Sequence, residues 1–284
     1  MHAVDSISSE IIELTNWLET PIGQYLLSWE QTSFDEAVSD IFGYHALQLG
    51  LPELNALQSN RMPHKWLAAT SASQAQAPFS PQLTRPGSTK PVPESSPRIA
   101  LLTDAAALPF AQNSLDLILL PHTLELNRDP HSILREVERV LVPEGRVVIS
   151  GFNPASLWGL SQRRGHFYRH FGHSKLFLPE NAELIGYWRL LDWLRLLGFE
   201  VESTRFGRYR PALNSQTWLN RFEWMDAAGA RWWPIFGAVY FLVAVKHVRG
   251  MRLLEPSWKS RRVPAAAGNA IAGKEALSSQ LPSD

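Results

Sequence analysis

The sequence predicts a doubly wound α/β domain, in which helices cover both faces of a mostly parallel sheet. Apolar runs without polar alternation, such as residues 114–120 and 146–150, are typical of strands buried on both faces. Residues 129–141, between these two runs, carry apolar side chains at helical spacing. The 284 residues are 45% hydrophobic and 19% charged, a globular composition that excludes a wholly disordered or fibrous chain.

The N-terminal third begins with amphipathic helix. Residues 1–36 carry apolar side chains at helical spacing, and Pro21-Ile22-Gly23 predicts a break into two helices. Further elements are expected in a fixed order: a strand at 46–51, a short helix at 53–60 and a second strand at 65–69. Residues 71–97 hold six prolines and one aromatic residue, so we expect a disordered insertion there.

The rest of the chain alternates strands and helices. Asp129-Pro130 places an N-cap and a first-turn proline before a helix. Leu184, Trp188, Leu191 and Leu194 predict the buried face of a later helix that starts at Pro179 and stops at Gly198. Strands are expected at 98–103, 114–120, 146–150, 199–202 and 238–246, followed by a frayed tail from about residue 255.

Composition narrows the function classes. Lys plus Arg and Asp plus Glu both number 27, so a uniformly basic nucleic-acid binder is not expected. The absence of cysteine excludes a disulfide framework, a thiolate zinc site and a cysteine nucleophile. Residues 232–245 form a 14-residue apolar stretch, shorter than the roughly 20 residues of a spanning helix, so we expect a buried core element there. Residues 1–10 lack the pattern of a secretory signal, and we expect a cytoplasmic protein.

Residues 104–154 resemble the second half of a class I S-adenosylmethionine-dependent methyltransferase of the methyltransferase type 11 family. No single motif is specific, but about fifty residues match the family's pattern in order. The matching residues are Asp104, Leu108-Pro109-Phe110, Ser114-x-Asp116, Arg135-Glu136-x-x-Arg139-Val140-Leu141, Pro143-x-Gly145 and Val147-Val148-Ile149. The resemblance implies a Rossmann-like, mostly parallel seven-stranded sheet with N-terminal helices and a cap insertion. It implies S-adenosyl-L-methionine as cofactor.

The resemblance divides the chain into three parts. Residues 1–37 are a helical segment, residues 38–250 the methyltransferase-like domain, and residues 251–284 a flexible tail. Residues 71–97 interrupt the domain, and residues 152–180 form a basic, aromatic cap whose rings either contact an acceptor or pack on the sheet edge.

The resemblance also assigns site residues. Asp104 matches the aspartate that accepts a hydrogen bond from the adenine amino group, with Ala105 beside it; an N-cap role for Asp104 is the alternative. Pro121 and His122 follow the next strand and match the segment that lines the methyl-transfer site. His122 or Glu125 could act as a general base, or His122 could be a packing residue. No metal is expected.

The sequence departs from the family after the first strand. The family carries an acid and Gly-x-Gly-x-Gly there, whereas this chain has Gln48, a single Gly50 and then Pro52, which lacks a backbone donor. Gln48 and Gly50 are therefore the expected cofactor contacts in the remnant of that loop. Acids such as Asp40 or Glu53 could hold the cofactor's ammonium in place of the lost glycines, or could only solvate a helix face.

Two functions remain open on the sequence. The first is a methyltransferase acting on an unidentified acceptor, for which the basic cap favours an anionic or aromatic compound and does not exclude nucleic acid. The second is a non-catalytic binding or interaction protein with an eroded cofactor site. A weaker third hypothesis, attachment to a membrane surface or RNA, rests on the basic segment and the 11 tryptophans.

Overall fold

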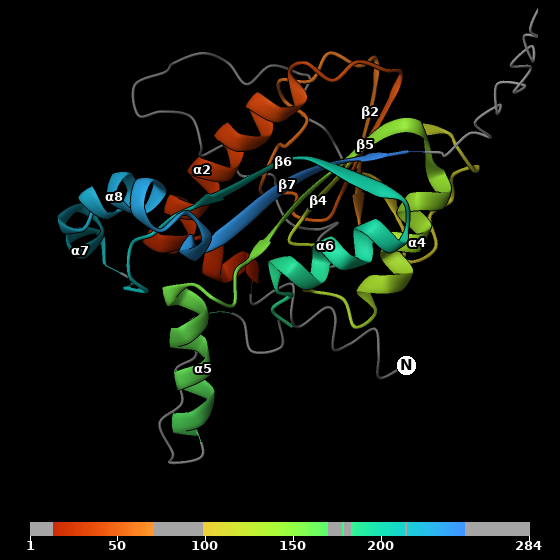
Figure 1. Cartoon of the computed structure of the whole chain (residues 1–284). Helices are drawn as coiled ribbons and strands as arrows, with labels where there is room; N and C mark the ends of the chain where they lie inside the picture. The colour runs from red at the N-terminus through yellow and green to blue at the C-terminus, as the bar shows by residue number, and fades with distance from the viewer. Residues whose placement is uncertain (1–13, 71–98, 170–177, 179–182, 214, 248–284) are drawn as a thin grey trace, which may run out of the picture. The chain divides into compact units, whose positions relative to one another are not determined.

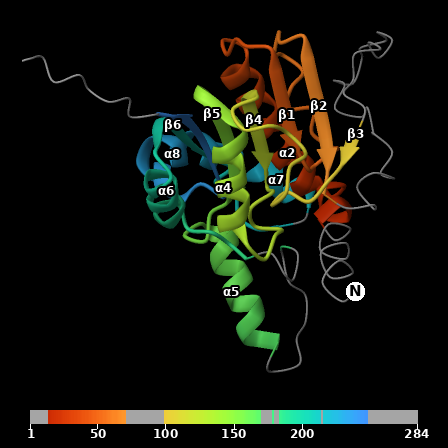
Figure 2. The same ribbon diagram turned by 90° about the vertical axis from the view of Figure 1, so that its right-hand side faces the viewer.

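The computed structural model describes residues 14–70, 99–169, 178, 183–213 and 215–247, without side chains at 166–169. Its centre is a seven-stranded sheet in the order β3-β2-β1-β4-β5-β7-β6 (Figures 1 and 2). The strands are β1 (His45–Leu49), β2 (His64–Ala69), β3 (Ile99–Leu102), β4 (Leu115–Pro121), β5 (Leu141–Phe152), β6 (Phe199–Gly207) and β7 (Val239–Lys246). Strand β7 runs antiparallel to both of its neighbours, and the other pairings are parallel. The predicted doubly wound, mostly parallel sheet is confirmed.

The N-terminal helices break where the sequence predicts. Residues 14–18 are helical, and α2 (Pro21–Val38) follows after a two-residue gap. The Thr20 hydroxyl caps α2 by accepting a hydrogen bond from the Gly23 N–H at 3.3 Å, and Pro21 occupies the first turn, where its missing N–H costs nothing.

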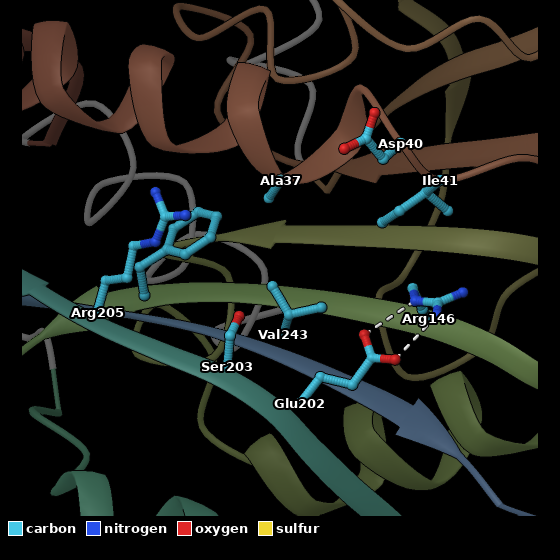
Figure 3. Close-up of a pocket in the computed structure, with 9 residues that line it drawn as sticks. Ala37, Asp40, Ile41, Arg146, Glu202, Ser203, Arg205 and Val243 are labelled. Atoms are coloured by element: carbon cyan, nitrogen blue, oxygen red, sulfur yellow. Dashed lines mark hydrogen bonds and ion pairs between the residues drawn. The ribbon is translucent and has the colours of Figure 1, made fainter.

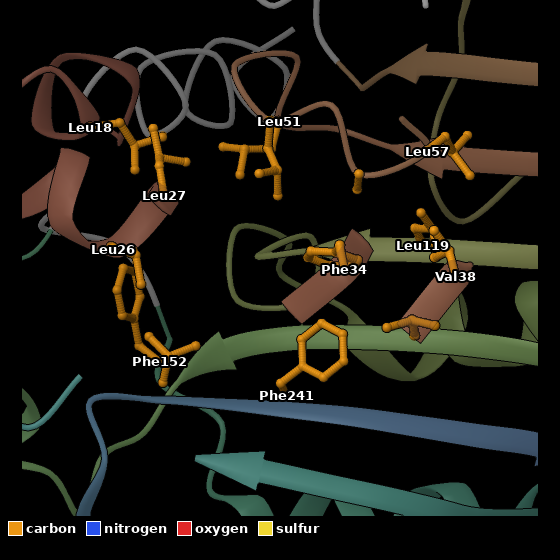
Figure 4. Packing of buried hydrophobic residues seen from close by; sticks show 14 of the residues in the cluster. Leu18, Leu26, Leu27, Phe34, Val38, Leu51, Leu57, Leu119, Phe152 and Phe241 are labelled. Atoms are coloured by element: carbon orange, nitrogen blue, oxygen red, sulfur yellow. The ribbon is translucent and has the colours of Figure 1, made fainter. Parts of the chain in front are cut away.

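Helices α4 (Pro130–Val140) and α6 (Tyr187–Leu196) cover one face of the sheet, and α2 covers the other (Figure 1). Asp129 caps α4 as predicted, since its side chain accepts the Ser132 N–H at 3.1 Å. Figure 4 shows the core on the α2 side, where side chains of the helix meet those of the sheet: Leu26, Phe34 and Val38 against Leu119, Phe152 and Phe241. None of the helices in the described part of the chain is long and apolar enough to cross a membrane.

Two long connections carry the remaining helices. Helix α5 (Leu157–Arg169) lies in the predicted cap and projects away from the sheet in both views (Figures 1 and 2). Helices α7 (Gln216–Arg221) and α8 (Trp224–Trp232) and the 3-10 helix η1 (Pro234–Phe236) lie between β6 and β7.

Three local predictions are wrong. Residues 53–60 form turns instead of a helix, because buried side chains, described below, bind their backbone groups. The helix expected from Pro179 begins at Tyr187; Leu184 precedes it and Trp188 is exposed, whereas Leu190, Leu191 and Leu194 are buried. The apolar stretch 232–245 divides, since residues 232–236 are exposed and only residues 237–245, which include most of β7, form the expected buried element.

Other predictions fall on residues that the structure does not describe. These are the insertion at 71–97, residues 170–177, 179 and 180 of the cap, and the tail at 251–284. The expected disorder of the insertion and of the tail stays a prediction.

Candidate functional site

The candidate site lies where the carboxyl ends of β1 and β4 meet. The strand order turns at this pair, because the chain continues from β1 outward to β2 and β3 and then returns to β4 on the other side. Open parallel sheets bind ligands in the crevice at such a switch point. The two strand ends are tied together, since the Thr123 hydroxyl donates to the Leu49 carbonyl at 2.7 Å.

Two of the five left-handed residues other than glycine in the described part of the chain lie at this point, and the other three, Asn113, Glu144 and Arg208, lie elsewhere. Gly50 has a φ of 73°, which glycine adopts freely, but the next residue, Leu51, has a φ of 46°. His122, at the end of β4, has a φ of 52°. Left-handed conformations at residues other than glycine cost of order 1–3 kcal/mol and concentrate at functional sites. Two of them therefore flank the switch point.

Gln48 shapes the loop that follows β1. Its side chain is fully buried, and its Nε2 approaches the carbonyl oxygens of Gly50, Leu51 and Leu54 at 3.3, 3.0 and 2.7 Å. Its Oε1 accepts the Ala56 N–H at 3.1 Å. A carboxylate could not donate to these three carbonyls, which explains why the acid of the family's first strand is absent here. The polar atoms of Gln48 are thus committed to its own loop.

His122 lies in a buried cluster of charged groups with Glu30 and Glu125. Its Nδ1 contacts a carboxylate oxygen of Glu125, and its Nε2 lies 2.9 Å from Glu30 Oε1. All three residues are at most 3% exposed. Burial alone lowers the pKa of His122, but the two carboxylates outweigh it and raise that pKa to about 10. The imidazole is therefore protonated at neutral pH, with both ring nitrogens facing carboxylates.

The cluster joins three parts of the fold. Glu30 comes from α2, His122 follows β4, and the second oxygen of Glu125 accepts the Phe152 N–H at the end of β5, at 2.9 Å. Glu30 is the member that the sequence analysis missed. The signal was present, because Glu30 shares the helical face of Leu26, Leu27 and Phe34, where a charged residue is unexpected.

Asp104 lies at the same carboxyl end of the sheet, after the outer strand β3. It directly follows Thr103 beyond the end of β3, and its side chain is exposed. Oδ1 accepts the Ala106 N–H at 2.9 Å, which closes a turn and not the helix N-cap of the alternative prediction. Oδ2 makes no hydrogen bond with the described residues, so it remains an available acceptor. Ala105 beside it is buried.

The structure thus groups the predicted site residues in two places. Gln48, Gly50, Pro121, His122 and Glu125 lie at the ends of the central strands β1 and β4. Asp104 and Ala105 follow β3, which β2 separates from β1.

Asp40 and Glu53, the two acids suggested for the cofactor's ammonium, lie at opposite ends of the sheet. Glu53 follows β1 at the carboxyl end, where the Thr15 hydroxyl donates to its Oε1 at 2.8 Å and its buried Oε2 has no described hydrogen-bond partner. Burial raises the pKa of Glu53, and the Thr15 hydrogen bond opposes that rise.

Asp40 lines a cleft of about 220 Å³ at the other end of the sheet (Figure 3). Arg146 lines the same cleft. It lies early in β5, opposite Leu117 near the start of β4 in the strand pairing. Its guanidinium forms two hydrogen bonds with Glu202, at 2.9 and 2.8 Å. This placement removes Asp40 from the candidate site.

Comparison with known proteins agrees with the fold described above. Residues 73–149 match the family described as Methyltransferase domain. A methyltransferase of Thermotoga maritima has a TM-score of 0.53 at 16% identity, over 86% of this chain and all of its own. A chain from the complex of the Haloferax volcanii Trm112 methyltransferase activator and a methyltransferase has a TM-score of 0.52 at 16% identity, over 84% of this chain and 97% of its own. At such identities the likeness shows the fold.

One curated relative is similar in sequence. The protein YafS of Escherichia coli strain K12, itself uncharacterized, is 42% identical over 109 residues, which are 38% of this chain. The match spans 42% of the length of YafS. Together with the strand order and the domain match over residues 73–149, the solved structures show that the chain has the fold of class I S-adenosylmethionine-dependent methyltransferases.

Proposed function

We propose that this protein is an S-adenosylmethionine-dependent methyltransferase that acts on an unidentified acceptor. The observation that carries the proposal is the pair of left-handed residues, Leu51 and His122, at the ends of the two strands that form the switch point. Strain of this kind persists only where the surrounding structure holds it, and it is typical of ligand sites. The domain match supplies the chemistry expected of such a site.

The residues at the sheet edge fit this cofactor in part. The free Oδ2 of Asp104 suits the adenine amino group, whereas Ala105 is buried among core side chains. Gly50 allows the backbone to approach the cofactor, and Glu53 offers a buried, unpaired carboxylate oxygen for an ammonium group. The end of β2 carries no acid for the ribose hydroxyls, since Ala69 and Thr70 stand there.

When bound, the cofactor supplies an electrophilic methyl group on its sulfonium. In this chain His122 is better suited to positioning than to proton abstraction, because its Nδ1 is hydrogen-bonded to Glu125 and its Nε2 lies at ion-pair distance from Glu30. We assign His122 and Glu125 the task of fixing the segment after β4, with Pro121 directly before it.

Calorimetric titration with S-adenosylhomocysteine tests the proposal. Asp104→Asn keeps an oxygen for the Ala106 N–H but replaces the second oxygen with a donor. We expect this variant to bind about tenfold or more weakly at an unchanged melting temperature, the order expected for one lost hydrogen bond plus an unpaired donor. Asp104→Ala, the control, additionally removes the turn and should lower the melting temperature. Equal affinity for wild type and Asp104→Asn would refute the adenine role.

A second candidate function is a non-catalytic binding protein with this fold. The burial of the polar side chains at the switch point favours it. Gln48, His122 and Glu125 are buried there and paired with other groups of the protein. The same titration separates the two functions. Absence of S-adenosylhomocysteine binding at millimolar concentration would reject the enzyme and favour the binding protein.

A further inference from the structure

The connection between β6 and β7 displays an unusual number of large apolar side chains. Its four tryptophans, at positions 218, 224, 232 and 233, are 47% to 71% exposed. We call the exposed set the aromatic patch: Leu213, Trp218, Trp224, Trp232, Trp233, Ile235 and Phe236. It lies on α7, α8 and η1, at the side of the molecule beyond the edge strand β6 (Figure 1). Exposed large apolar side chains gathered on one connection in this way indicate an interaction surface.

The patch is held firmly by the rest of the protein. Asp226 on α8 accepts hydrogen bonds from the Tyr209 N–H at 3.1 Å and from Arg210 Nε at 2.8 Å. The Tyr209 hydroxyl donates to the Pro234 carbonyl at 2.9 Å, and Asn153 Nδ2 donates to the Ile235 carbonyl at 2.7 Å. The backbone beneath the rings is thus anchored to the residues that follow β5 and β6. Local disorder does not explain their exposure.

The charged side chains around the patch differ in whether they face the protein or the solvent. Asp226 turns inward to Arg210, so it presents little negative charge outward. Arg221 and Arg231 are exposed in the last turns of α7 and α8, against one exposed acid, Glu223. The Arg221 guanidinium lies 5.6 Å from the centre of the Trp218 ring. The outward face therefore combines indole rings with a small excess of positive charge.

We propose that the aromatic patch attaches the protein to the surface of a lipid bilayer that contains anionic headgroups. Indole rings favour the boundary between headgroups and acyl chains, because the ring is apolar and its N–H finds polar partners there. Arginines beside them meet phosphates of anionic lipids. The rings come from three short elements on one connection, which suits shallow insertion into the headgroup region.

Vesicle flotation of the full chain tests this surface. Vesicles of phosphatidylcholine with phosphatidylglycerol serve as the probe, and vesicles of phosphatidylcholine alone serve as the uncharged comparison. We expect wild type to bind the anionic vesicles, and the triple variant Trp224→Ser, Trp232→Ser, Trp233→Ser to bind them at least tenfold more weakly. Trp188→Ser is the matched control, because Trp188 is 66% exposed on α6, outside the patch; this variant should bind like wild type.

A second pair of substitutions tests the charge. Arg221→Gln with Arg231→Gln should weaken binding to anionic vesicles and leave binding to phosphatidylcholine vesicles unchanged. Melting temperatures and circular dichroism identify any variant that fails to fold, in which case the arginine pair decides. Wild type that floats with neither vesicle, or a folded triple variant that floats like wild type, would overturn the proposal. A dimer that the triple variant dissociates, without vesicle binding, would assign the patch to a second copy of the chain and also overturn it.

Discussion

Replacing Gln48 with leucine should destabilise the protein through the loop after β1. Leucine approximates the volume of glutamine but offers no hydrogen bonds. The amide group has two N–H donors and one acceptor engaged, so about three hydrogen bonds are lost among the four close contacts. Each buried partner left unsatisfied costs about 1–3 kcal/mol, and burying leucine returns roughly 1.5–3 kcal/mol. We expect a net loss of about 3 kcal/mol from a stability of the order of 5–15 kcal/mol.

Urea denaturation followed by far-ultraviolet circular dichroism measures this loss. Gln31→Leu is the matched control, because Gln31 reaches the same loop from α2 through one hydrogen bond, to the Asn55 carbonyl at 2.9 Å. The control should cost about 1 kcal/mol or less. Gln48→Glu should be at least as damaging as Gln48→Leu, since a carboxylate would face the carbonyls of Gly50, Leu51 and Leu54.

Two outcomes would refute this account of the loop. The first is a loss for Gln48→Leu no larger than that of the Gln31→Leu control. The second is a stable Gln48→Glu variant, which would mean that the loop can open to receive the acid found in the family.

Two further predictions concern charge. The pKa of His122 is about 10 in the folded protein against 6.5 for a free imidazole, so its stabilising effect is complete below pH 6.5 and disappears as the pH rises through 10. Urea denaturation at pH 6 and pH 10 should therefore show that the difference in free energy of unfolding between wild type and His122→Gln shrinks at the higher pH. A difference that stays constant would show that His122 is not a buried cation. Glu53→Gln should weaken the binding of S-adenosylmethionine and leave the affinity for adenosine unchanged. Asp40→Asn should change neither affinity, because Asp40 lies at the other end of the sheet. Equal effects of the two substitutions in calorimetry would contradict this assignment.

The strands were predictable from the sequence because their local pattern and their tertiary environment agree. The central strand β4 is apolar throughout apart from Asp116, and the sheet buries it on both faces. Asp116 is compatible with this burial, since it lies near the start of the strand and accepts hydrogen bonds from the N–H groups of Tyr44 and His45, both at 2.9 Å. Helix α4 was equally clear, because Asp129 and Pro130 mark its start independently of packing.

The wrong predictions arise where distant side chains decide the backbone. Residues 53–60 have a composition that suits a helix, but Gln48 binds the carbonyl of Leu54 and the N–H of Ala56, and the Asn60 side chain binds the carbonyls of Val38 and Ile41. These contacts use backbone groups that a helix would need for itself. No local pattern reports them, since the partners come from other parts of the chain.

The site was predictable in its position but not in its chemistry. Motif order placed Asp104 and His122 at strand ends, where the structure has them. Whether His122 could act as a base depended on Glu30, which lies 92 positions earlier on α2 and reaches it only in the folded protein. A pKa depends on the groups that surround a residue in space, so the sequence could leave both roles open but could not decide between them.

Helix α2 connects the core to the candidate site. A parallel crossover normally carries a helix that covers the sheet, yet residues 50–63 join β1 to β2 by turns alone. Helix α2 covers that face instead, through side chains such as Phe34 (Figure 4). Its Glu30 reaches His122. The face and the charge beneath the switch point thus depend on one helix that precedes the first strand. A ligand at the switch point would therefore lie against α2 as well as against the strand ends, so its affinity depends on how α2 packs against the sheet.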